Sequence, residues 1–309
     1  MTKTLFAAAC LLALATATAQ GQSDTASGHV TLTVLPAHPE EQNASLVASQ
    51  LAVKVDGKQA TVTELTPVAS AKSPLELVLL IDGSVRASLY GQASDIIGFV
   101  KEIPSNTQMA IAYMQNGNAA LQGPLTSDAA AVEQGLHLTT GTPGSNGSPY
   151  FCLSELAKHW PSKVAGARRA VVMITDGVDE YERQYDPDDP NVKSAIDDSL
   201  RAGIVVYTIY WHDEGRGSST EAESNAGQNL LLAVTQATGG NSYWQGIGNP
   251  PSLQPFFDDL RRRLRNEYDL GFTVPIKGKP GIHELKIKAS APAAKVVAPQ
   301  SVYLGAATH

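Results

Sequence analysis

A nearly unbroken apolar run from Leu77 to Ile81, followed at once by Asp82-Gly83-Ser84, constrains the fold of this chain more than any other stretch. A strand with apolar side chains on both faces is stable where helices cover both faces, as in a parallel sheet. Ala170 to Thr175 is a second run of this kind, and it ends in Asp176-Gly177. The chain is therefore predicted to contain an α/β domain with a doubly wound, mostly parallel sheet.

Strand and helix patterns alternate from residue 73 to residue 267, as the crossover connections of a parallel sheet require. Two short apolar runs around Asn116-Gly117-Asn118 are the exception, because this turn signal predicts an antiparallel pair. Besides the two runs above, strands are predicted at 109–114, 119–125, 204–210 and 242–244, and helices at 89–103, 129–138, 149–160, 192–202, 228–237 and 253–267.

Both ends of the chain are rich in alternating, β-branched stretches. Three strands are predicted at 29–35, 51–55 and 59–65, and three more at 268–274, 283–289 and 295–303. Neither set has enough strands to bury a face alone, so the two are predicted to pair into one β-sandwich beside the α/β domain. The expected divisions are 28–72, 73–267 and 268–305, with a small polar linker before residue 75.

Residues 1–19 have the pattern of a cleaved signal peptide, with Lys3 near the start, an apolar run from Leu5 to Ala15, and small residues before Gln20. The mature protein is therefore expected to be secreted or periplasmic. Cys10 offers an alternative as a lipid attachment site, but the apolar run continues beyond it. No later stretch approaches the ~20 apolar residues of a membrane-spanning helix, so membrane insertion is not expected.

The formal net charge of −7 argues against nucleic acid as the main partner, because a basic surface dominates that kind of binding. Cys152 is the single cysteine of the mature chain, so no internal disulfide is expected. It lies in a helical pattern with Leu153 and Leu156, which favours a small buried hydrophobic residue over a reactive thiol.

The two strand ends, Asp82-Gly83-Ser84 and Thr175-Asp176-Gly177, make residues 73–267 resemble a von Willebrand factor type A domain. The flanking segments look like a bacterial family of secreted proteins related to this domain. The resemblance implies a Rossmann-like fold and a metal-ion-dependent adhesion site for Mg²⁺ or Mn²⁺. Carried over to this sequence, the metal ligands would be Asp82, Ser84, Asp176 and a loop residue, for which Ser148 is the main candidate and Thr142 the weaker one.

Arg86 departs from that pattern, because it stands where such domains have a second serine. Mg²⁺ prefers about six oxygen ligands, and a guanidinium offers none. A guanidinium about 5 Å from a divalent ion would also cost on the order of 6 kcal/mol at an effective dielectric of about 20. Arg86 is therefore interpreted as a ligand-binding residue that could meet a carboxylate through a bidentate pair.

Several polar groups also have a structural interpretation. Asp82 and Asp176 could cap turns and helix starts, as D-G dipeptides commonly do. The adjacent His212, Asp213 and Glu214 favour a solvated loop over a metal cluster. For the acidic stretch, capping of the following helix is favoured over cation binding by Asp186, Asp188 and Asp189. For the basic stretch, offset of the helix dipole is favoured over an anion site formed by Arg261, Arg262, Arg263 and Arg265.

The leading hypothesis is a secreted, non-enzymatic binding or adhesion module. Its ligand would be a protein or a glycan, bound through an acidic group, with or without a metal ion. A structural or assembly subunit with a vestigial site is the alternative. A hydrolase or phosphotransferase is disfavoured, because the sequence has no G-x-S-x-G elbow and has Ser84 where an aspartyl phosphotransferase needs a second acid.

Overall fold

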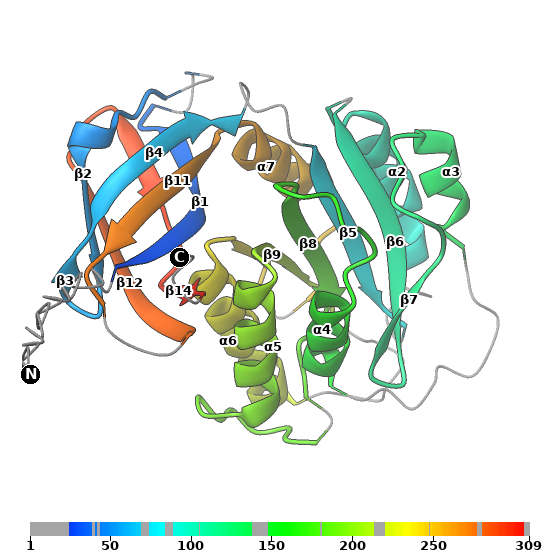
Figure 1. Ribbon diagram of the computed structural model, residues 1–309. Coiled ribbons are helices and arrows are strands. Elements are labelled where there is room, and N and C mark those ends of the chain that lie inside the picture. Colours follow the sequence, from blue (N-terminus) through cyan, green and yellow to red (C-terminus); the bar gives the residue numbers. More distant parts are fainter. Residues whose placement is uncertain are drawn as a thin grey trace, which may run out of the picture.

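The computed structural model describes residues 25–38, 41, 44–68, 74–83, 89–104, 106–137, 148–179, 181–212, 220–246, 248–276 and 280–305. An α/β part and a β-sandwich lie side by side (Figure 1). The predicted signal peptide and three candidate site residues, Ser84, Arg86 and Thr142, lie outside the described residues.

A six-stranded sheet with the order β10-β9-β8-β5-β6-β7 forms the centre of the α/β part. Counted along the chain this order is 3-2-1-4-5-6, which is that of a doubly wound fold. Only the β6–β7 pair is antiparallel, as the Asn-Gly turn predicts. The predicted fold is confirmed. The strands are β5 (Leu75–Asp82), β6 (Thr107–Gln115), β7 (Asn118–Leu121), β8 (Arg168–Thr175), β9 (Ile204–Tyr210) and β10 (Ser242–Tyr243).

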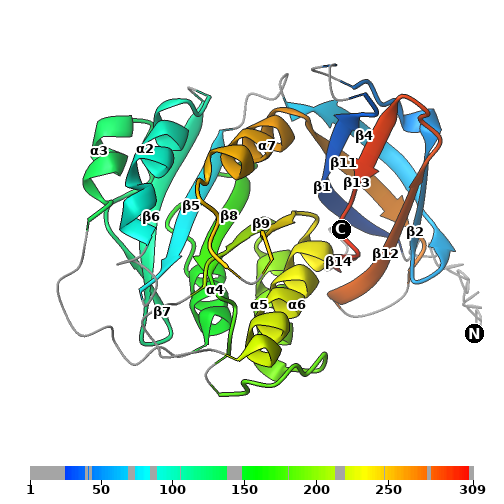
Figure 2. The same ribbon diagram turned by 180° about the vertical axis from the view of Figure 1, so that it is seen from behind.

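Helices cover both faces of this sheet (Figures 1 and 2). Odd-numbered side chains of β5 pack against α2 (Ala93–Lys101), α3 (Ala129–Gln134) and α7 (Gln254–Arg265). Val78 and Leu80, on the other face, share a core with α4 (Pro149–Lys158), α5 (Pro190–Arg201) and α6 (Glu221–Thr238). Cys152 is buried in this second core, as expected. None of the helices within the described ranges has the length and apolar character needed to cross a membrane.

Glu76 interrupts the apolar character of β5, although its side chain is fully buried. The indole Nε1 of Trp160 donates a hydrogen bond to Glu76 Oε2 at 2.6 Å, and Arg169 Nε lies 3.7 Å from the same oxygen. Arg169 also stacks over the Trp160 ring. A buried carboxylate is tolerated here because it is paired and hydrogen-bonded.

The β-sandwich consists of two four-stranded sheets, β13-β1-β11-β4 and β14-β12-β2-β3, around a shared apolar core. Strands from the two chain ends are direct neighbours, with Val30 opposite Leu270 and Val53 opposite Ile287. The predicted sandwich is confirmed. Its strands are β1 (Ala26–Pro36), β2 (Leu51–Val55), β3 (Lys58–Gln59), β4 (Thr61–Pro67), β11 (Glu267–Val274), β12 (Gly281–Ala289), β13 (Ala294–Val297) and β14 (Ser301–Leu304), and short 3₁₀ turns lie at Ala48–Gln50 and Tyr90–Gln92.

Several predicted boundaries were wrong. The strand expected at 59–65 is two strands, β3 and β4, which lie in different sheets. The single strand expected at 295–303 is two strands in different sheets, because Pro299 has no backbone N–H and the chain crosses between the sheets there. The strand expected at 119–125 ends at Leu121. Helix α6 begins seven residues before the predicted start, because Thr220 and Glu223 form a capping box.

A buried ion pair connects the two parts of the molecule. Arg168, at the start of β8, pairs with Glu267, at the start of β11, and Glu267 is only 2% exposed. The hydroxyl of Tyr207 on β9 donates a hydrogen bond to the other carboxylate oxygen at 3.1 Å. Polar groups on the outer face of the β1–β11 sheet therefore contact the α/β part.

Candidate functional site

The candidate site lies where the strand order of the central sheet reverses. β5 and β8 are neighbours, but the chain continues from them toward opposite edges of the sheet. In such sheets the crevice beyond the carboxyl ends of these two strands is the usual ligand site. β5 ends at Asp82 and β8 is followed by Asp176, and each carboxylate is only 5% exposed.

Thr175 connects the two strand ends. Its hydroxyl donates a hydrogen bond to Asp82 Oδ2 at 2.8 Å and accepts one from the Gly177 N–H at 3.1 Å. Asp176 Oδ1 accepts a hydrogen bond from the Val178 N–H at 3.0 Å. The orientations of both carboxylates are therefore fixed by neighbouring groups. Sequence reasoning assigned no role to Thr175, although its position before Asp176 was the available signal.

The turn after Asp176 depends on two glycines, one in the turn itself and one in helix α6. Gly177 has φ +69°, a left-handed conformation that other residues rarely adopt. Helix α6 contacts this turn through Gly227, where an added Cβ would lie 2.1 Å from the Asp176 carbonyl oxygen. The close approach of α6 holds the Asp176 turn in place.

Ser148 is fully buried at the start of α4, where its Oγ accepts a hydrogen bond from the Tyr150 N–H at 3.1 Å. The Tyr150 hydroxyl donates to the Gly177 carbonyl at 2.8 Å, which ties α4 to the Asp176 turn. Burial, with the nearby Asp176 and Asp179, raises the pKa of Tyr150 well above its ordinary value, so this hydroxyl stays protonated. Pro149 and Asp82 line the same small cavity of about 10 Å³. Asp82, Asp176 and the start of α4 therefore converge on one edge of the sheet.

The donors at this edge suit a hard divalent cation. Asp82, Asp176 and Ser148 offer only carboxylate and hydroxyl oxygens, the ligands that Mg²⁺ and Mn²⁺ prefer. Within the described residues, however, no three His, Cys, Asp or Glu side chains are grouped to hold a metal ion. A metal here would thus depend on hydroxyl or water oxygens in addition to the two carboxylates.

Other acidic groups near the site have structural roles. Asp189 caps α5, accepting hydrogen bonds from the N–H groups of Asn191 and Val192 at 2.7 and 3.2 Å. Asp188 pairs with Lys193 at 2.6 Å. Asp186 Oδ1 accepts from the Asp188 N–H. The predicted capping is confirmed for Asp189, whereas Asp186 and Asp188 make other local contacts.

Three arginines of the basic stretch in α7 form ion pairs with neighbouring acids, and Arg262, Arg263 and Arg265 lie in the last turn as predicted. Arg262 and Arg263 both pair with Asp259, at 2.9 and 2.6 Å, and Arg261 pairs with Asp258 and Glu102. The backbone N–H of His212 donates to Asn249 Oδ1, while Asp213 and Glu214 lie outside the described residues.

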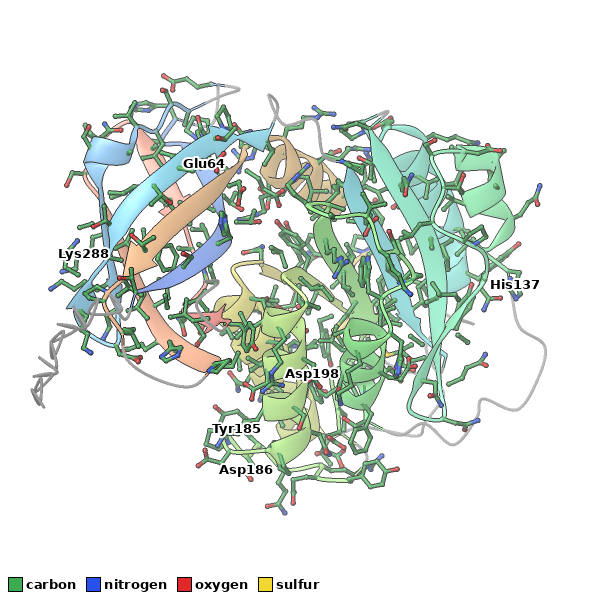
Figure 3. The ribbon with its side chains drawn as sticks, viewed as in Figure 1. Glu64, His137, Tyr185, Asp186, Asp198 and Lys288 are labelled. Carbon is green, nitrogen blue, oxygen red and sulfur yellow. The ribbon has the colours of Figure 1, made fainter. Side chains whose placement is uncertain are left out.

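Exposed aromatic residues flank the site and were not predicted. Tyr181 is 70% exposed, Tyr185 52% and Phe151 38%, and the rings of Phe151 and Tyr181 meet edge to face at 5.5 Å. Figure 3 shows Tyr185 beside Asp186 at the bottom of the view, beyond the start of α5. Tyr181 and Tyr185 lie in a loop without a periodic pattern, and Phe151 lies in the first turn of α4. Only their nearness in sequence to Asp176 and Ser148 could have indicated this surface.

No family model matches the chain, and no curated protein does. Among solved structures, the chain is similar to an aerotolerance-related membrane protein from Bacteroides fragilis (TM-score 0.46, 17% identity), over 62% of this chain and 98% of that one. It is also similar to proximal thread matrix protein 1 from the mussel byssus, in a structure with a zinc-occupied MIDAS motif (TM-score 0.44, 14% identity). That match covers 71% of this chain and 49% of that one. A third similar structure is the pilus adhesin SpaC from Lactobacillus rhamnosus GG (TM-score 0.46, 10% identity). That match covers 82% of this chain and 48% of that one.

The fold assignment does not depend on these likenesses. The strand order, the single antiparallel pair and the two helical layers give the α/β part the von Willebrand factor type A-like fold that the strand-end motifs predict.

Proposed function

We propose that this protein is a secreted, non-enzymatic binding module of the adhesion type. Its ligand surface is the carboxyl-end edge of the central sheet, around Asp82, Ser148 and Asp176. The observation that supports this most is the pair of buried carboxylates at the strand-order reversal, with Thr175 bonded to Asp82. Burying carboxylates costs free energy unless other groups compensate, so their placement beside a surface favours a binding role.

The proposed ligand is a protein or glycan that presents an acidic group. A divalent ion, Mg²⁺ or Mn²⁺, would be held by Asp82, Ser84, Ser148 and Asp176, and when bound it would accept a carboxylate oxygen of the ligand. Without the ion, Arg86 would meet that carboxylate through a bidentate pair. The exposed rings of Phe151, Tyr181 and Tyr185 would contact the rest of the ligand, because aromatic side chains are enriched at the centres of interfaces.

Acetate is the minimal probe of this site. Titration followed by NMR, with and without Mg²⁺, should show acetate shifting the resonances of Gly177 and Val178. Asp176→Asn keeps the shape of the side chain and should abolish the difference that Mg²⁺ makes to the acetate-induced shifts. Asp186→Asn, a partly exposed acid on the same loop, is the matched control and should leave the acetate-induced shifts unchanged. Acetate that shifts no resonance in either condition would contradict the proposed site.

Arg86→Ser separates the two modes of binding. The serine would restore the missing ligand oxygen and remove the repulsion between the guanidinium and the metal ion. The Mg²⁺ affinity measured by calorimetry should therefore rise by several orders of magnitude, given the ~6 kcal/mol Coulomb figure and 1.4 kcal/mol per tenfold change in affinity. Metal-independent acetate binding should be lost in the same variant. Equal Mg²⁺ affinities in the native and Arg86→Ser proteins would refute the role given to Arg86.

A further inference from the structure

A cavity of about 440 Å³ lies between the α/β part and the sandwich. Arg168 and Ile204, at the starts of β8 and β9, line one side of it, and His29 to Thr31 of β1 line another. It is therefore at the opposite edge of the central sheet from Asp82 and Asp176. Its volume lies in the range of about 300 to 1,000 Å³ that is typical of small-molecule sites, which often occur between domains.

Much of the cavity wall is apolar. Leu200, Ile204 and Val205 contribute to it from the α/β part, and Val302 and Pro299 from the sandwich. A small molecule with an apolar body would gain burial against these side chains.

Asp269 supplies the acidic group in this wall, which also contains Arg168 and His29. It projects from β11 opposite Thr31 and is partly buried. Within the described part of the chain it forms no hydrogen bond or ion pair. Burial raises the pKa of its carboxyl; the charge of His29 lowers it, that of Glu64 raises it, and that of Arg168 lowers it. Arg168 forms its ion pair with the buried Glu267 and not with Asp269.

Two helix ends add to the negative potential around the cavity. Leu200 lies in the last turn of α5 and Thr238 is the last residue of α6, and both line the cavity. The carboxyl end of a helix carries about half a negative charge, and this favours cations nearby. One carboxylate with no ion-pair partner among the described residues and two helix carboxyl ends therefore point to a positively charged ligand.

We propose that this cavity binds a small organic cation, an amine with an apolar body whose ammonium group pairs with Asp269. The apolar body lies against Leu200, Val205 and Val302. This inference does not rest on the proposed function, because the two sites lie at opposite edges of the sheet and share no residue.

Phenethylammonium is the probe for the test, with 2-phenylethanol and 3-phenylpropionate as neutral and anionic analogues of similar shape. Binding to the full chain is measured by calorimetry and ligand-observed NMR at mildly alkaline pH. A charged pair in a partly buried site should make the amine bind about tenfold more tightly than the alcohol, with the acid weakest. Asp269→Asn should remove this preference, while Glu64→Gln, on the neighbouring strand, should retain it.

Ala167→Phe is a second variant, which fills the cavity from the α/β part and leaves the β1–β11 pair around Asp269 unchanged. It should weaken all three compounds together, and circular dichroism on each variant checks that the fold is intact. Equal affinities for the three compounds, no measurable binding of the amine, or an unchanged preference in folded Asp269→Asn would each overturn the proposal.

Discussion

The central sheet of the α/β part is covered on both faces by helices from the same stretch of chain, whereas each sheet of the sandwich has its apolar cover on one face only, from the other sheet. The strands that pair in the sandwich come from opposite ends of the sequence, as with Val30 and Leu270. The first part can therefore bury its core without the second. The sandwich depends on both chain ends being present.

The two parts also differ in charge and in where they bury polar groups. Residues 73–267 contain 14 Lys and Arg against 23 Asp and Glu, while residues 25–72 and 268–305 contain eight against six. In the α/β part, Asp82 and Asp176 are buried at the edge that we propose binds ligand. At the junction with the sandwich, the buried Glu267 instead joins the two parts. Buried acids thus lie at the proposed binding edge in one place and at an internal contact in the other.

Dividing the chain should have the largest effect and tests the comparison directly. A fragment of residues 73–267 should fold with a cooperative thermal transition, because its sheet keeps both helical layers. A fragment of residues 25–72 should remain unfolded, because its strands lose β11 and β12. Dispersed amide NMR signals from the shorter fragment would show that the sandwich does not need both chain ends.

Gly227→Ala should perturb the α/β part and leave the sandwich intact. The added methyl would lie 2.1 Å from the Asp176 carbonyl oxygen, so the turn or α6 must move, at a cost of more than about 3 kcal/mol of unfolding free energy. Urea denaturation measures the loss, and NMR shifts should concentrate around Asp176. Gly98→Ala, in α2, is the matched control, because nothing lies within 4 Å of its added Cβ. A neutral effect at Gly227 would mean that α6 does not hold the turn.

Glu267 should make the junction sensitive to pH. Burial raises its pKa from 4.5 to about 7, opposed by Arg168 and by the Tyr207 hydrogen bond. The folded protein then keeps a proton that the unfolded chain releases between these pH values. The free energy of unfolding should therefore fall as pH rises from about 4.5 to about 7, by about 3 kcal/mol from this group.

Glu267→Gln keeps an acceptor for Tyr207 and should remove that slope in denaturant titrations across this pH range. Glu64→Gln, on the neighbouring strand β4 and labelled at the top of the sandwich in Figure 3, should retain it. An unchanged slope in Glu267→Gln would assign the titration to another group.

Much of the architecture could be predicted from local patterns. The apolar runs at Leu77–Ile81 and Ala170–Thr175 required cover on both faces, and the Asn116-Gly117-Asn118 signal located the antiparallel pair. The break at Pro299 was missed, because the sequence keeps a strand-like alternation on both sides of the point where the chain passes from one sheet to the other. For the site, the strand-end motifs located Asp82 and Asp176 correctly at one edge of the sheet.

The sequence by itself determined which segments are strands or helices and which strand ends carry acidic groups, because periodicity and turn chemistry act between near neighbours in the chain. Only the tertiary structure decided that Thr175 bonds to Asp82, that Gly227 contacts the Asp176 turn, and that Glu267 and Asp269 face the α/β part. These contacts join residues far apart in sequence. Alternation along β11 marks Glu267 and Asp269 as outward-facing, but whether that face meets water or another domain depends on how the two parts pack.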